Sequence, residues 1–358
     1  MAIFKQKNPE EEVEETSFSQ SARNRWEKFA PKHPLSRKKE PPKPWTSRDR
    51  YLVSIVLGTT LITSILLALS AREWKLPRLS RLALPKLELS IFKGGTIVIK
   101  GDNKAKDLKL KVQEEKIVSE FKDIIEGLSG VYGLYVVDLG TGYSFGVNEE
   151  EVFEAASLIK LPVMAGMYLN HELGIINLDS KYTLKNVDKV SGAGSLYSKP
   201  EGYEITYRNL VSLMGKQSDN TAFNVTKKLL GGEKFNEVTK KIGMQKTSLA
   251  DNETTPRDIG VFFEELYKGN IVNEKDKNEL LDSLTDTLYE QWLKAGIADN
   301  VRLAHKYGRE VHVVNDGGIV FSENPFVVVV LSKGVVEREA DEVFPKLARI
   351  VYDNMVGN

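Results

Sequence analysis

The longest apolar run of the chain covers residues 51–71, where no charged residue falls between Arg50 and Arg72. A helix of this length spans the hydrocarbon core of a bilayer, so the pattern predicts one transmembrane helix. Residues 1–50 are rich in Glu, Lys, Arg, Ser and Pro and cannot form a core, so we expect a disordered tail. Basic residues flank the run on both sides. We place the tail in the cytoplasm and expect a single-pass cell-membrane protein whose C-terminal domain is extracytoplasmic.

The pattern changes again after the apolar run. Residues 72–114 are basic and contain two prolines, which is typical of a connector. Residues 115–358 alternate between helical and strand periodicity, and this segment is expected to form one domain. The predicted order is a helix at 117–128, strands at 131–139 and 143–147, a mostly helical stretch at 207–294, strands at 301–306, 311–314 with 318–321, and 326–331, and a helix at 339–355. This order predicts an α+β fold with one antiparallel sheet, built from both ends of the segment and flanked by helices.

The composition excludes several classes of chemistry. The chain contains no cysteine, which removes disulfides, thiolate catalysis and cysteine metal sites. Its four histidines are scattered without metal-binding spacing, so we expect neither a metal nor another cofactor. Fifty basic residues balance fifty acidic ones, and this balance gives no indication of a nucleic-acid partner.

The first candidate for chemistry is the pair Ser157 and Lys160, at the start of an apolar helical run. Residues three apart on a helix share one face, so the two side chains can meet. A serine hydroxyl becomes a nucleophile when a neighbouring base takes its proton. A lysine can be that base if burial or another cation lowers its pKa. On the pair alone, an ordinary N-capping serine followed by a surface lysine is the favoured interpretation.

Two further motifs follow in the chain. Ser218-Asp219-Asn220 lies between two helical runs, and Lys306-Tyr307-Gly308 ends a predicted strand. S-x-x-K, S-D-N and K-T-G, in this order, form the motif set of class A β-lactamases. From about residue 115 to the C-terminus, the chain therefore resembles the class A β-lactamases and the related penicillin-binding serine enzymes. Further segments that resemble the family lie at residues 192–196, 254–258 and 315–320.

The resemblance implies a catalytic role for each of four side chains. Ser157 would be the acylated nucleophile, and Lys160 would take its proton. Ser218 would relay a proton to the leaving nitrogen. Lys306 would keep the pKa of Lys160 low and attract the substrate carboxylate.

The resemblance also implies four substrate-binding positions. Asn220 would hold the substrate amide and Lys160, while Asp219 would brace its loop. Gly308 continues the strand that borders the substrate, and the backbone N–H of Arg309 would form an oxyanion hole with that of Ser157. Tyr307 stands where the family has Thr or Ser. Because a phenol is bulkier and reaches further, we expect its ring to alter carboxylate recognition.

A second departure concerns the loop that activates water in class A β-lactamases through E-x-x-L-N. Residues 244–256 read MQKTSLADNETTP, so the loop is short and lacks that motif. Glu253 is its only glutamate, and a charge in the first turn of a helix is the favoured interpretation.

The sequence therefore predicts a membrane-anchored serine hydrolase that forms an acyl-enzyme with β-lactams, hydrolyses the amide and deacylates slowly. The alternatives are a D-Ala-D-Ala carboxypeptidase or penicillin-binding protein acting on peptidoglycan, and a binding or sensor module without turnover.

Overall fold

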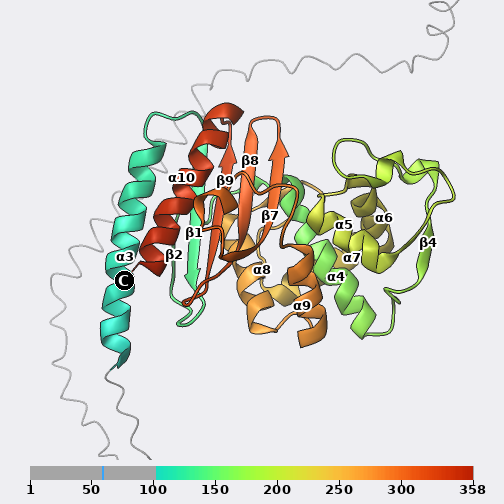
Figure 1. The fold of residues 1–358 in the computed structure, drawn as a ribbon, viewed down its shortest axis with the longest axis horizontal. Coiled ribbons are helices and arrows are strands. Elements are labelled where there is room, and N and C mark those ends of the chain that lie inside the picture. The colour runs from blue at the N-terminus through green and yellow to red at the C-terminus, as the bar shows by residue number, and fades with distance from the viewer. Residues whose placement is uncertain (1–58, 60–101, 358) are drawn as a thin grey trace, which may run out of the picture. The chain divides into compact units, whose positions relative to one another are not determined.

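The computed structural model describes residue 59 and residues 102–357 (Figure 1). The predicted tail, nearly all of the predicted membrane span and most of the predicted connector lie outside these residues. Within the described part of the chain, no helix is both long enough and apolar enough to cross a membrane. The account that follows concerns residues 102–357.

A five-stranded antiparallel sheet forms the centre of the domain, in the order β2-β1-β9-β8-β7. Its strands are β1 (Val131–Asp138), β2 (Ser144–Val147), β7 (Arg302–Glu310), β8 (Val313–Phe321) and β9 (Phe326–Lys333). The central strand β9 contains four consecutive valines, which are buried because helices cover both faces of the sheet. Strand β7 lies at one edge, so its outer backbone groups remain available to a neighbouring element.

Two helices cover one face of the sheet, namely α3 (Asp102–Ile125) and α10 (Glu337–Val356). Figure 1 shows them side by side, with α10 packed between α3 and the strands. Their buried side chains form one apolar cluster with the sheet. The first and last helices of the described domain therefore pack together on the same face.

The other face of the sheet packs against the helical part of the domain. This part contains α4 (Lys160–Glu172), α5 (Tyr207–Lys216), α6 (Asn220–Leu230), α7 (Gly232–Ile242), α8 (Pro256–Lys268) and α9 (Glu274–Ser283). Helix α4 is buried over most of its length, because α5, α6, α7 and α9 surround it (Figure 1). Two small two-stranded sheets complete the domain: β3 (Phe153–Glu154) with β6 (Glu253–Thr254), and β4 (Lys181–Thr183) with β5 (Glu204–Thr206).

This arrangement confirms the predicted α+β fold, with three differences. Helix α3 begins at Asp102, because most residues at 102–116 favour a helix and none is Gly or Pro, so part of the predicted connector is helical. The predicted helical stretch at 207–294 contains five separate helices. The two segments predicted at 311–314 and 318–321 form the single strand β8. A side chain at Gly318 would lie 2.4 Å from the Ala304 carbonyl, so the glycine permits close pairing with β7.

Candidate active site

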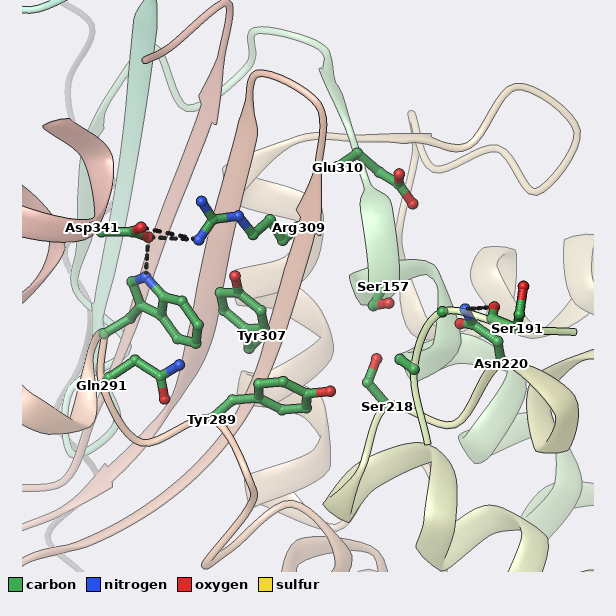
Figure 2. Close-up of a pocket in the computed structure, with 13 residues that line it drawn as sticks. Ser157, Ser191, Ser218, Asn220, Tyr289, Gln291, Tyr307, Arg309, Glu310 and Asp341 are labelled. Carbon is green, nitrogen blue, oxygen red and sulfur yellow. Dashed lines mark hydrogen bonds and ion pairs between the residues drawn. The ribbon is translucent and has the colours of Figure 1, made fainter. Parts of the chain in front are cut away.

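Ser157 lies in a short 3₁₀ turn, Ala156–Ile159, that leads directly into α4. The turn is fixed on both sides. Ala155 donates its N–H to the Asn252 carbonyl at 2.7 Å, and Ala156 adopts a left-handed φ of 48°. The N-cap of the turn is Ala155, and no side chain caps it. The interpretation of Ser157 as an N-capping serine is therefore wrong, and its hydroxyl lines a pocket instead (Figure 2).

Lys160 is a buried lysine whose nitrogen has three side-chain neighbours. Its Nζ lies 3.0 Å from Ser157 Oγ, 3.0 Å from Ser218 Oγ and 2.8 Å from Asn220 Oδ1. A further contact of 2.6 Å joins Nζ to the Ser218 carbonyl oxygen. Only 2% of the residue is exposed, so the surface-lysine interpretation is also wrong.

Burial lowers the pKa of Lys160 to about 7, although the charges of Asp219 and Glu310 act in the opposite direction. Near neutral pH a substantial fraction of Lys160 is therefore uncharged. An uncharged amine 3.0 Å from a hydroxyl has the position and the protonation state that a general base requires.

The loop before α6 carries Ser218 in a strained conformation. Ser218 has a φ of 53°, which is uncommon for a residue other than glycine. The buried Asp219 carboxylate accepts hydrogen bonds from the backbone N–H groups of Ala222 at 2.8 Å and Leu196 at 2.8 Å. Gly194 permits this approach, since a Cβ there would lie 2.1 Å from the carboxylate. Asp219 thus braces the loop that holds Ser218 against Lys160.

Lys306 enters the same cluster from β7. Its Nζ lies 3.0 Å from Ser218 Oγ and 2.6 Å from the Tyr307 carbonyl oxygen. Burial lowers the pKa of Lys306 well below its usual value, and the charge of Lys160 lowers it further. The resemblance implied that Lys306 keeps the pKa of Lys160 low. In the structure, the main cause of this low pKa is the burial of Lys160 itself.

The edge of β7 carries a second feature of the site. A Cβ at Gly308 would lie 2.9 Å from the Ser157 nitrogen, so the two backbones are in direct contact. Val314 pairs with Arg309 and directs its own N–H to Ser332 on the other side of β8, at 3.0 Å. Arg309 and Val314 therefore form a non-hydrogen-bonded pair of the antiparallel ladder, in which both residues point their N–H groups away from each other. The Arg309 N–H therefore points out of the free edge of β7, the side on which Ser157 lies.

Tyr307 does not occupy the face of β7 that carries Lys306, because successive side chains of a strand alternate. Its ring stacks on Trp292 at a centroid distance of 3.6 Å and on Tyr289 at 5.1 Å. Burial raises the pKa of its hydroxyl above the usual value. The ring belongs to an aromatic wall of the pocket (Figure 2), and the expectation that it alters carboxylate recognition stays a prediction.

The sequence did not indicate several other residues of the pocket. The pocket has a volume of about 860 Å³. Several of the predicted site residues line it, as do Gly192 and Ala193 of the segment 192–196 that resembles the family. The further lining residues are Ser191, Tyr289, Gln291, Trp292, Glu310 and Asp341. Asp341 on α10 accepts hydrogen bonds from the Arg309 guanidinium at 2.8 Å and from the Trp292 indole at 2.8 Å. These residues come from distant parts of the chain, and no local motif marks them.

Glu253, the only glutamate in the short loop, lies in β6, where it pairs with Glu154 of β3. Its side chain is exposed and it is not among the residues that line the pocket. The interpretation as a charge in the first turn of a helix is wrong, because Thr255 caps α8 and Pro256 begins it. The loop at residues 244–255 contributes no side chain to the pocket lining.

The α+β fold and the contacts of Lys160 with Ser157 and Ser218 indicate a hydrolase, and comparison with known proteins agrees. The model of the family described as "Beta-lactamase enzyme family" matches residues 116–355, so the chain belongs to this family of hydrolases. A β-lactamase of Streptomyces lavendulae is 26% identical over 239 residues, which are 60% of this chain and 78% of that protein.

Two solved structures are also similar. One is a PBP-A mutant in an acyl-enzyme complex with penicillin G, with a TM-score of 0.61 and 26% identity over 69% of this chain and 96% of that one. The other is a β-lactamase from Sphaerobacter thermophilus, with a TM-score of 0.63 and 25% identity over 67% of this chain and 96% of that one.

Proposed function

We propose that this protein is a serine acyl hydrolase that opens β-lactams through an ester on Ser157. The observation that carries the proposal is the contact of the buried Lys160 amine with the hydroxyls of both Ser157 and Ser218. Membership of the β-lactamase family and the likeness to a protein with a penicillin G acyl-enzyme complex support β-lactams as substrates.

The proposed acylation uses five side chains and two backbone groups. The neutral Lys160 amine takes the Ser157 proton as Oγ attacks the lactam carbonyl. The negative charge on the carbonyl oxygen is stabilised by the N–H groups of Ser157 and Arg309. Ser218 gives its proton to the leaving nitrogen and regains one from Lys160, while Lys306 supports that hydroxyl from the other side. Asn220 holds Lys160 and is placed to bind the substrate amide.

We propose that deacylation is the slower half-reaction. An ester is hydrolysed quickly only when a positioned base activates water. The short loop at 244–255 places no carboxylate in the pocket, which supports accumulation of the acyl-enzyme.

The test is intact-mass analysis of residues 102–358 over time after exposure to benzylpenicillin. We expect one stoichiometric adduct that maps to Ser157 and decays slowly, and none in Ser157→Ala. Ser180→Ala, at an exposed serine outside the pocket lining, is the matched control and should still form the adduct. A wild-type protein that turns over the drug rapidly without an adduct would contradict the proposed slow second step.

A second candidate is a D-Ala-D-Ala carboxypeptidase acting on peptidoglycan. The short loop favours it, since long-lived penicillin esters are compatible with an enzyme whose natural substrate is a peptide. Release of D-alanine from a peptide ending in D-Ala-D-Ala, at a rate above that of β-lactam turnover, would establish this activity. A binding or sensor module without turnover would show the adduct and neither product.

We also propose that residues 51–71 anchor the protein in the cell membrane, with the catalytic domain outside the cytoplasm. The uncharged apolar run between Arg50 and Arg72 supports this location. Protease added to intact cells or spheroplasts should remove the C-terminal domain. Digestion only after lysis would reverse the orientation.

A further inference from the structure

Glu310 is the last residue of β7, and it lines the same pocket as Ser157. Residues two apart on a strand share a face, so Glu310 is on the face that carries Lys306 and Gly308. Gly308 contacts the backbone of Ser157, and Glu310 projects from the next position on that face. Figure 2 shows the Glu310 carboxylate on the side of Ser157 opposite Ser218 and Tyr289.

Two carboxylates line the pocket, and they differ in their contacts. Asp341 is engaged by the guanidinium of Arg309 and the indole of Trp292. For the Glu310 carboxylate, the part of the chain that the structure describes offers no hydrogen bond or ion pair, and the side chain is exposed. Its charge still reaches Lys160, whose pKa it raises. Glu310 is therefore a solvated carboxylate close to the catalytic cluster, with no structural partner among residues 102–357.

We infer that Glu310, an exposed carboxylate at the end of β7, is the base that activates water for the slow hydrolysis of the Ser157 ester. The inference rests on the proposed acyl-enzyme function and assigns its second half-reaction. The loop that carries the deacylating glutamate in class A β-lactamases contributes nothing to the pocket lining here, whereas β7 places a glutamate there. The proposed base thus lies at the end of the edge strand β7, whereas the family carries its deacylating glutamate on a loop.

The proposed step balances as follows. Glu310 takes one proton from a water molecule, and the water oxygen forms a bond with the ester carbonyl carbon. The resulting oxyanion is held by the N–H groups of Ser157 and Arg309. Glu310 passes this proton through solvent to the neutral Lys160 amine. The bond between the carbon and Ser157 Oγ then breaks, and the Lys160 ammonium so formed, 3.0 Å from Oγ, protonates it. Lys160 is again neutral, Glu310 is again a carboxylate, and the product leaves as a carboxylic acid.

The test separates the two half-reactions. The full chain is acylated with benzylpenicillin, freed of excess drug, and followed by intact mass for wild type, Glu310→Gln and Glu253→Gln. We expect Glu310→Gln to form the adduct to the same extent and to lose it about a hundredfold more slowly. Glu253→Gln is the matched control, because it removes an exposed loop carboxylate outside the pocket lining, and its adduct should decay at the wild-type rate.

A second readout distinguishes a base from a neighbouring charge. If Glu310 acted only through its charge on Lys160, Glu310→Gln would shift the pH dependence of acylation and of adduct decay together, and would leave the decay rate on the pH plateau unchanged. Equal decay on that plateau in wild type and Glu310→Gln would therefore overturn the assignment while leaving the acyl-enzyme function intact. Absence of any adduct in the wild type would overturn both.

Discussion

Lys160 and Lys306 approach the same hydroxyl from two different elements, and the Nζ of each lies 3.0 Å from Ser218 Oγ. Both side chains are almost fully buried, with exposures of 2% and 1%. Burial disfavours a charged ammonium, and two like charges around one oxygen disfavour each other. The arrangement therefore favours proton loss from the lysines, which is the property that a proton relay through Ser218 needs.

Replacing Lys160 tests the base directly. Lys160→Ala should reduce the rate of acylation by about a hundredfold to ten-thousandfold, because a general base contributes on that scale. Lys160→Arg should not restore the rate, since a guanidinium keeps its proton. Stopped-flow measurement with a chromogenic cephalosporin checks both variants. Lys240→Ala, an exposed lysine on α7, is the control. An unchanged rate in Lys160→Ala would assign the proton transfer to another group.

The acylation rate should depend on pH with a defined sign. The base is the neutral form of Lys160, and its pKa is lowered to about 7, so acylation should rise as the pH increases through about 7 and then level off. Burst rates measured over a pH series, with circular dichroism to confirm the fold at each point, give this profile. A rate that falls across the same interval would mean that the reaction needs the protonated amine.

Tyr307 should act through packing. Tyr307→Phe keeps the ring that stacks on Trp292, so stability and acylation should change little. Tyr307→Thr removes the ring from the apolar cluster and should lower the free energy of unfolding by about 3 kcal/mol. Urea denaturation and acylation by a carboxylate-bearing penicillin distinguish the variants. Faster acylation by Tyr307→Thr would show that the ring obstructs the substrate.

A buried histidine should make stability depend on pH. Burial lowers the pKa of His305, but the charges and hydrogen bonds of Asp316 and Glu290 outweigh it and raise this pKa to about 9. The folded protein thus binds the proton more tightly than the unfolded chain does, in which the pKa is about 6.5. This stabilisation is fully present below about pH 6.5 and is lost as the pH rises through about 9.

The measurement compares wild type with His305→Gln in urea at several pH values. The difference in unfolding free energy should be largest near pH 6 and should shrink toward about pH 9. At lower pH, Glu290 becomes relevant. Burial raises its pKa, but the hydrogen bond and charge of His305 lower it to about 2. The stabilisation from Glu290 is present above about pH 4.5 and is lost as the pH falls through about 2. A difference that grows with pH would contradict this account of the cluster.

Much of the fold and the central part of the site were determined by local sequence. Alternating and continuous apolar runs specified the strands, since side chains on a strand repeat every two residues. The spacing of Ser157 and Lys160 specified their contact, because residues three apart share a helical face. The three short motifs named Ser218 and Lys306 in advance, and the structure brings both to Lys160.

The tertiary structure decided the properties that depend on contacts between distant segments. The low pKa of Lys160 follows from burial beneath the Ser218 loop, and burial cannot be read from one helix. The side of β7 occupied by Tyr307 and its stacking on Trp292 depend on how a loop folds over the sheet. The position of Glu310 beside Ser157 depends on the edge strand lying against the start of α4. Sequence periodicity reports which face of an element is apolar, whereas the groups that meet across two elements are set by packing.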